Sequence, residues 1–219
     1  EAGAVTLSKM CGSGMKAAMF AHDMLLAGTH DVMVAGGMES MTNAPYLLQK
    51  GRGGYRLGHD RIFDHMMLDG LEDAYEAGRS MGTFGEDCAA KYQFTREQQD
   101  AFATASVQRA KAATESGAFA AEIVPVTVKD RSGERVVSVD EGPGKVKLEK
   151  IATLKPAFKK DGTITAASSS SINDGAAALV MMRESTAKKL GAKPLARIVS
   201  HATNPQEPEW FATAPLGAT

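Results

Sequence analysis

A cysteine beside a glycine-rich turn is the part of this sequence best suited to chemistry. Cys11 precedes a Gly-Ser-Gly turn and stands between an extended segment at residues 5–7, which we expect to end a strand, and a helical pattern at 12–27. A helix N-terminus carries unpaired N–H groups and the positive end of the helix dipole, and both favour a thiolate over a thiol. Cys11 is therefore a candidate nucleophile. Burial as an inert structural side chain explains a cysteine here equally well.

The pattern on either side of this turn indicates an α/β domain. After Gly28, the apolar run at 31–35 is typical of a buried strand in a β–α–β unit, and we expect Gly36 and Gly37 to end it. The helix at 12–27 should bury one stripe of side chains at helical spacing, formed by Met15, Met19, His22 and Leu26.

A second α/β segment lies near the other end of the sequence. The apolar run at 176–182 predicts a core strand, and residues 184–190 predict a short helix that ends at Gly191. A further strand is expected at 195–200. We expect residues 31–35 and 176–182 to share one core sheet.

The stretch between these segments has a different character. Thr95 and Gln98 form a capping box, which predicts a long helix to about Ser116. Two strands are expected to follow, at 122–128 and 135–139. The fold class is therefore α/β with an insertion. Residues 1–40 and 166–219 are predicted to form one core domain, and residues 41–165 a separate lobe.

Composition excludes several classes of protein. The 219 residues have a formal net charge of −1, which favours neither nucleic acid nor an anionic membrane as the main partner. No apolar run approaches the length of a transmembrane helix. Cys11 and Cys88 have no spacing typical of a disulfide framework or a metal site, so we expect no metal and a reducing compartment. We interpret Cys88 as structural. Both ends of the sequence are abrupt, so we expect the chain to be cut from a longer protein.

Several motifs occur together in an order and spacing typical of one known family. They are Lys9–Ala17 around Cys11, Ala35–Tyr46, Met81–Thr83 with Glu97–Ala103, and Lys155–Phe158 with Gly162–Ala167 and Asn173–Ala178. The chain resembles the thiolases, and among them the short-chain acetyl-CoA acetyltransferases. The resemblance implies a thiolase-like N-terminal α/β core with a large inserted α+β loop domain that binds coenzyme A.

The resemblance also implies a reaction. The Cys11 thiolate takes an acyl group from acetyl-CoA, and the α-carbanion of a second acetyl-CoA attacks it to give acetoacetyl-CoA; the reverse is thiolysis. Coenzyme A thioesters are the substrates, with no cofactor and no metal. We expect a cytoplasmic enzyme of bacterial type, with organelle import left open, that forms a homodimer or homotetramer at full length. Two alternatives remain: a longer-chain 3-ketoacyl-CoA thiolase, or a truncated, non-catalytic fragment that binds coenzyme A or serves assembly.

Six further residues match family positions that contact coenzyme A or the acyl group. The resemblance implies contacts with the pantetheine arm for Ser170, and with the adenine and pantetheine for Phe158 and Ala166. It implies contacts with the acyl and pantetheine region for Leu71 and Met81, and with the phosphates for Lys145, to which Lys147 and Lys150 are alternatives. Each also has an ordinary interpretation. Phe158 suits a core position, Lys145 a solvated charged surface, and the serine run at 168–171 a loop with side-chain turns.

Other family features are missing. Ser80 stands before Met81 where many thiolases have a histidine, and Ser168 stands where an asparagine is common. The family's catalytic histidine lies in a Gly-His-Pro motif, its second cysteine in Cys-x-Gly-Gly-Gly, and an asparagine in Asn-Glu-Ala-Phe. None of these motifs occurs in the 219 residues. We therefore expect the C-terminal thiolase domain to be absent and the chain to be incomplete for catalysis.

Overall fold

The computed structural model describes residues 2–219, which form two compact units. One unit contains the chain up to Met81 together with Ile172–Thr219, and the other contains Gly82–Ser171. The domain boundaries expected at residues 40 and 165 remain a prediction. None of the described helices is long and apolar enough to cross a membrane.

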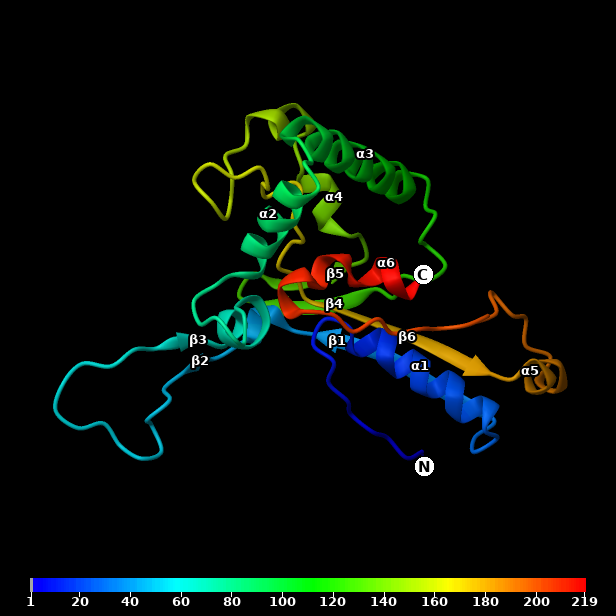
Figure 1. The fold of residues 1–219 in the computed structure, drawn as a ribbon. Coiled ribbons are helices and arrows are strands. Elements are labelled where there is room, and N and C mark those ends of the chain that lie inside the picture. The colour runs from blue at the N-terminus through cyan, green and yellow to red at the C-terminus, as the bar shows by residue number, and fades with distance from the viewer. Residues whose placement is uncertain (1) are drawn as a thin grey trace. The chain divides into compact units, whose positions relative to one another are not determined.

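The first unit is built on one helix and a two-stranded sheet. Helix α1 (Ser13–Leu26) leads into strand β1 (Val32–Glu39), which pairs antiparallel with β6 (Gly175–Met182) (Figure 1). The register runs from Val32 opposite Met182 to Glu39 opposite Gly175. The prediction that residues 31–35 and 176–182 share one sheet is confirmed, as is the helix expected at 12–27.

Glycine has a different role in β1 from the one predicted. The strand does not end at Gly36 and Gly37 but continues through both to Glu39. A Cβ atom on Gly36 would lie 2.2 Å from the carbonyl oxygen of Ala177 on β6. Glycine inside a strand marks a close approach of another backbone, and here that backbone is the neighbouring strand.

The buried side of α1 also differs from the predicted stripe. Met15 and Leu26 are each 70% exposed. The core is instead formed by three alanines and one leucine of the helix against the sheet: Ala17, Ala18, Ala21 and Leu25 with Met33, Ala35 and Met181. Alanine permits a closer approach of helix to sheet than methionine does, so the small residues face inward.

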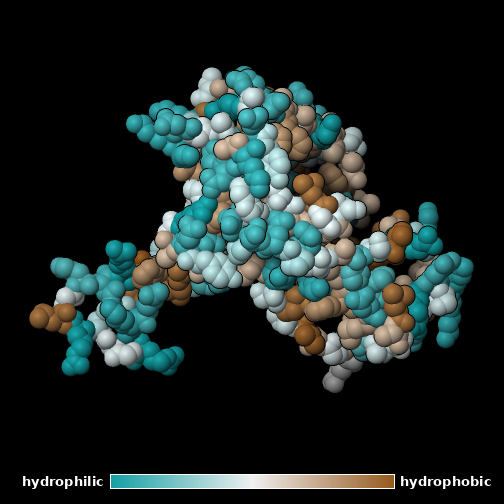
Figure 2. All heavy atoms as spheres, viewed as in Figure 1, coloured by the Kyte–Doolittle hydropathy of each residue, from teal (hydrophilic) through white to brown (hydrophobic). Residues whose placement is uncertain are grey.

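The expectation of fully buried strands is wrong for this chain. Ala35 is the buried residue of β1, and Met181 that of β6. Val34 and Val180, which lie opposite each other, are both more than two-thirds exposed. Hydrophobic side chains accordingly reach the surface among hydrophilic ones (Figure 2). The continuous apolar runs of β1 and β6 are typical of a sheet that is covered on both faces. Among the described residues of this unit, α1 provides most of the cover that the sheet has.

Short elements complete the first unit. Helix α5 (Glu184–Leu190) is confirmed at the predicted residues, and Gly191 ends it with a left-handed φ of +65°. The strands predicted at 5–7 and 195–200 are wrong, because neither segment pairs with another strand among the described residues. The remaining elements are η1 (Met41–Asn43), β2 (Tyr46–Leu47) paired with β3 (Phe63–Asp64), η2 (Met67–Leu71), α5 (Glu184–Leu190), η4 (Pro208–Thr213) and α6 (Ala214–Ala218).

The second unit is organised around a capped helix. Helix α3 (Arg96–Glu115) begins at Thr95, whose Oγ1 accepts from the Gln98 N–H at 3.2 Å, while the Thr95 N–H donates to Gln98 Oε1 at 2.9 Å. The predicted capping box is confirmed. The two predicted strands occur as a hairpin with shifted bounds. The other elements here are α2 (Met81–Lys91), β4 (Val126–Asp130), β5 (Gly133–Val137), α4 (Glu141–Lys145) and η3 (Leu148–Thr153).

Candidate functional site

Cys11 lies in a tight turn directly before α1 and is exposed. The hydroxyl of Ser13 holds this turn: its Oγ accepts from the Lys9 N–H at 2.8 Å and donates to the Met10 carbonyl at 2.7 Å. Met10 has a left-handed φ of +51°, which places the backbone immediately before Cys11 in a sharp bend. The side chain of Ser13 therefore fixes the backbone that carries the thiol.

The helix after Cys11 presents its positive end to this turn. Gly12 is the N-cap and makes no side-chain capping bond, and the first turn of α1, which is fully described, contains no acidic side chain. The helix dipole is thus not neutralised locally, and it favours a negative charge near this end. An exposed thiol at such a position can act as a nucleophile on a thioester carbonyl.

Two glycines allow the start of α1 to pack closely against the sheet. A Cβ atom on Gly37 would lie 3.3 Å from the Cα of Gly14, and one on Gly14 would lie 3.7 Å from the Gly37 nitrogen. The Cys11 turn is therefore anchored to β1 through backbone contact. The sequence predicts that Gly12 and Gly14 leave room for a substrate carbonyl and for close packing of the helix, and the approach of Gly14 to Gly37 confirms the packing role.

A carboxylate links the segments that follow β1 and precede β6. Asp174 Oδ1 accepts from the Thr42 N–H at 2.9 Å. Hydrogen bonds from the Thr42 backbone and side chain, and then from the Met41 backbone, hold the pKa of Asp174 below its usual value. Both segments belong to motifs noted in the sequence, but the contact between them joins residues 132 positions apart and has no local signal.

In the second unit a buried carboxylate shapes a loop. Glu86, which is 6% exposed, accepts from the Thr163 and Ile164 N–H groups at 2.9–3.0 Å and from the Thr163 hydroxyl at 3.2 Å. A Cβ atom on Gly162 would lie 2.2 Å from Glu86 Oε1. A buried charge is tolerated only when it is hydrogen-bonded, and these donors meet that need. Sequence analysis did not single out Glu86.

Three of the predicted coenzyme A contacts lie on the segment that contains this loop. Phe158 is 38% exposed, and its ring packs so closely on Gly82 that a Cβ atom there would lie 2.2 Å from Cγ. Ala166 and Ser170 are exposed on the same segment. The geometry leaves all three accessible from solvent, and their contact with coenzyme A stays a prediction.

The other three predicted contacts lie on separate elements. Lys145 is exposed at the end of α4, where its Nζ forms an ion pair with Glu141, and this pairing lowers the pKa of the Glu141 carboxyl. Leu71, at the end of η2, and Met81, at the start of α2, are half-buried. Leu71, Met81 and Cys11 belong to the first unit, and Lys145 belongs to the second.

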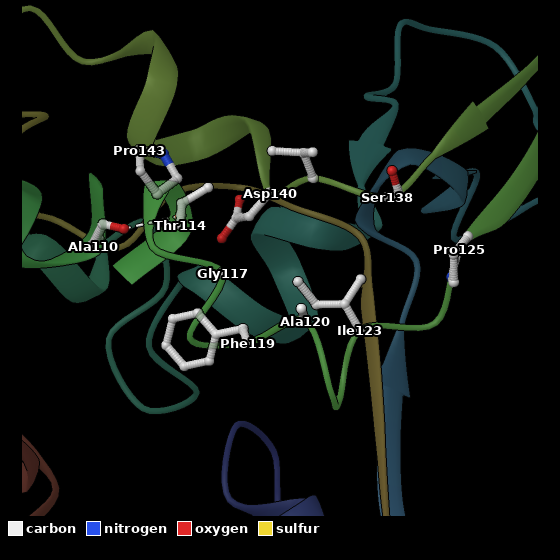
Figure 3. A pocket seen from close by; sticks show the side chains of 11 residues that line it. Ala110, Thr114, Gly117, Phe119, Ala120, Ile123, Pro125, Ser138, Asp140 and Pro143 are labelled. Carbon is white, nitrogen blue, oxygen red and sulfur yellow. Dashed lines mark hydrogen bonds between the residues drawn. The ribbon is translucent and has the colours of Figure 1, made fainter. Parts of the chain in front are cut away.

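The second unit also contains a largely apolar cavity of about 320 Å³ (Figure 3). It lies between the end of α3 and the segments that flank the β4–β5 hairpin. No predicted coenzyme A contact is among its lining residues, which are Ala110, Thr114, Gly117, Phe119, Ala120, Ile123, Pro125, Ser138, Val139, Asp140 and Pro143.

Comparison with known proteins places this geometry in a family. Residues 1–185 match the family described as "Thiolase, N-terminal domain". The chain is 49% identical over 213 residues to "Acetyl-CoA acetyltransferase 2" of Arabidopsis thaliana, covering 96% of this chain and 53% of that protein. It is 46% identical over 218 residues to "Acetyl-CoA acetyltransferase" of Pseudomonas aeruginosa, covering 99% of this chain and 55% of that protein. The chain thus spans about half the length of the curated relatives it matches.

Solved structures agree with the sequence relatives. The acetyl-CoA acetyltransferase from Syntrophomonas wolfei superposes with a TM-score of 0.88 at 42% identity, covering 97% of this chain and 53% of that one. The acetyl-CoA acetyltransferase of Bacillus anthracis gives a TM-score of 0.88 at 41% identity, covering 97% and 55%. The α/β fold and the family resemblance predicted from the sequence are both confirmed.

Proposed function

The chain belongs to the thiolase family, and we propose that it supplies the nucleophile of an acetyl-CoA acetyltransferase. The observation that carries this proposal is the exposed Cys11 thiol, held by Ser13 in a turn at the uncapped N-terminus of α1. The names of the relatives support acetyl groups over longer acyl chains. No nucleic acid or membrane partner is proposed.

The proposed reaction has two halves. The Cys11 thiolate attacks the carbonyl carbon of acetyl-CoA, the bond from that carbon to the coenzyme A sulfur breaks, and coenzyme A leaves as a thiolate that takes up a proton. A second acetyl-CoA loses an α-proton to a base, and its carbanion attacks the acetyl group on Cys11. A carbon–carbon bond forms, acetoacetyl-CoA leaves, and the Cys11 thiolate is regenerated.

The backbone around Cys11 is suited to stabilising the charge in the first half. The oxyanion that develops on the thioester carbonyl needs N–H donors, and the Cys11 N–H beside the positive end of α1 is such a donor. We assign the base that removes the α-proton to no residue of this sequence. The family's base lies in motifs that this sequence does not contain.

We place the coenzyme A moiety along the segment from Phe158 to Ser170. Glu86 fixes the backbone of this segment at Thr163 and Ile164, so the exposed Ala166 and Ser170 are presented from an ordered loop. Lys145 contributes a point charge toward the phosphates, and Leu71 and Met81 are assigned to the acyl region. We propose a cytoplasmic homodimer or homotetramer for the protein at full length.

Acylation mapping tests the proposal. The full-length protein is incubated with acetyl-CoA, digested, and analysed by peptide mass spectrometry. We expect an acetyl group on Cys11, and we expect Cys11→Ser to lose at least about 10³-fold in turnover, since removing a catalytic nucleophile can cost about 10⁶-fold. Cys88→Ser is the matched control and should retain activity. Acetyl confined to Cys88, or full turnover by Cys11→Ser, would refute the assignment.

A further inference from the structure

Three side chains with metal-binding atoms converge on α1, away from the Cys11 turn. They are His22 and Asp23 of the helix and His201 from the irregular segment that passes beside it (Figure 1). Their ligand atoms all lie within 4.8 Å of one another. His22 lies nine residues beyond Ser13, about 14 Å along the axis at 1.5 Å per residue. The cluster is therefore separate from the proposed nucleophile.

Two of the three distances within the cluster, those from Asp23 to each histidine, are close to those of a tetrahedral metal site. Asp23 Oδ1 lies 3.2 Å from His22 Nδ1 and 2.8 Å from His201 Nε2. Two donor atoms bound tetrahedrally at 2.0–2.1 Å from zinc stand about 3.3 Å apart. The His22 distance already fits, and the His201 distance needs to open by about 0.5 Å. Coordination therefore needs small side-chain movements, and it also needs the proton that each ring nitrogen donates to Asp23 to be released or moved to the other nitrogen of the ring, because a metal binds the unprotonated nitrogen.

The environment keeps the three groups both ordered and accessible. The side chains of His22 and His201 are 18% and 26% exposed, and that of Asp23 is 55% exposed. The two imidazole rings meet edge to face with centroids 5.2 Å apart. Two imidazole nitrogens and one carboxylate oxygen form a familiar ligand set for zinc.

We propose that His22, Asp23 and His201 bind one divalent transition-metal ion of the imidazole-preferring class, with Zn²⁺ as the type ion and solvent at the fourth position. Imidazole nitrogen suits zinc, copper and nickel, whereas magnesium and calcium prefer an all-oxygen set. The ion links the middle of α1 to a segment that carries no regular secondary structure. It acts as a structural link, because its distance from Cys11 excludes direct contact with the reacting thioester.

Sequence spacing gave no sign of this site. His22 and Asp23 are adjacent, which resembles no common ligand motif, and His201 lies 178 positions from Asp23. The expectation that the protein binds no metal rested on the spacing of the cysteines. The ligands proposed here contain no cysteine and are brought together only by the fold.

Metal titration of the natural-length protein tests the proposal. The thiols are alkylated first, and Zn²⁺ binding is then measured by calorimetry, with Co²⁺ as a visible-absorbing probe of tetrahedral nitrogen and oxygen coordination. The variants are His22→Gln, His201→Gln and the isosteric Asp23→Asn. His59→Gln is the matched control, because His59 is exposed and lies outside the cluster. Circular dichroism checks that each variant retains its secondary structure.

We expect one saturable Zn²⁺ site in the parent protein and in His59→Gln. Loss of a residue that only supports a ligand costs about 10–100-fold in metal affinity, so loss of a ligand should cost at least as much. The Co²⁺ absorption band should weaken in the same three variants. Equal Zn²⁺ affinity in all five proteins, or no saturable binding in the parent, would overturn the proposal and leave the cluster as a hydrogen-bonded contact.

Discussion

Two loops in this molecule are held by a side chain that bonds to backbone groups, and they differ in burial. The Cys11 turn is held by two hydrogen bonds between the Ser13 hydroxyl and the backbone, and both are exposed to solvent. The loop at 162–164 is held by the Glu86 carboxylate, which is almost fully buried and bonds to two backbone N–H groups. One contact is neutral and exposed, and the other is charged and enclosed.

The difference indicates where each loop can tolerate change. A hydrogen bond exposed to water contributes little net stability, because water replaces the lost partner. Buried donors that lose their acceptor bear the full cost of desolvation, about 1–3 kcal/mol each. The coenzyme A segment is therefore expected to be rigid and sensitive to substitution, whereas the turn that carries the nucleophile depends on its hydroxyl for position more than for stability.

The largest effect is expected from Glu86→Ala. It removes the acceptor of the Thr163 and Ile164 N–H groups, and we expect the free energy of unfolding to fall by about 2–4 kcal/mol. Native-state hydrogen exchange should show faster exchange at these two amides. The matched control is Glu115→Ala, at an exposed position on α3, which should change stability by less than about 0.5 kcal/mol. If the two substitutions lowered the free energy of unfolding by similar amounts, the buried Glu86 contact would not be the stabilising one, and the contrast between the two loops would not hold.

A smaller change in stability is expected from Ser13→Ala. It removes two exposed hydrogen bonds, and the free energy of unfolding should fall by about 1 kcal/mol or less. Its main effect should be on the reactivity of Cys11, since the Met10 bend loses its support. We expect iodoacetamide to alkylate Cys11 at a changed rate, with Ser8→Ala, an exposed neighbour, as the control. A large loss of stability with an unchanged alkylation rate would contradict this interpretation of the turn.

The sequence predicted features set by local patterns. The capping box at Thr95 and Gln98, the helix that ends at Gly191 and the start of α1 all depend on contacts within four residues, and all three are confirmed. Pairing of residues 31–35 with 176–182 was also predicted correctly, because both runs are strongly apolar. Local pattern also gave Cys11 as a candidate nucleophile, and the family resemblance, carried by several motifs in order, added the reaction and the proposed coenzyme A contacts.

Features set by distant contacts were missed or wrong. Gly36 was assigned to the end of a strand because glycine usually interrupts one, but the close approach of Ala177 requires it inside β1. The stripe of α1 was assigned from hydrophobicity, and the small residues face the sheet instead. Glu86 and Asp174 are acidic residues with no local signal, and their roles become visible only when Thr163 and Thr42 are brought beside them.

The smallest effect is expected from Asp174, a further carboxylate that bonds to backbone; it compares with Glu86 but is open to solvent. Its pKa is lowered by hydrogen bonds from the backbone and side chain of Thr42 and from the backbone of Met41. A carboxyl whose pKa is lower in the folded state contributes stability above its unfolded pKa, and that contribution is lost as the pH falls through the folded value. The loss should therefore begin below about pH 4, the ordinary range of an aspartate, and grow as the pH falls further.

Nuclear magnetic resonance of the Thr42 amide follows this contact directly. Between neutral pH and about pH 4 the amide resonance should stay constant, and at lower pH it should shift as Asp174 is protonated. Asp174→Asn should abolish this shift, because an amide does not titrate in this range. It should leave the Thr163 and Ile164 amides unaffected, since these bond to Glu86. A Thr42 resonance that titrates identically in Asp174→Asn would show that another group controls the loop, and the resemblance between this contact and the Glu86 loop would not hold.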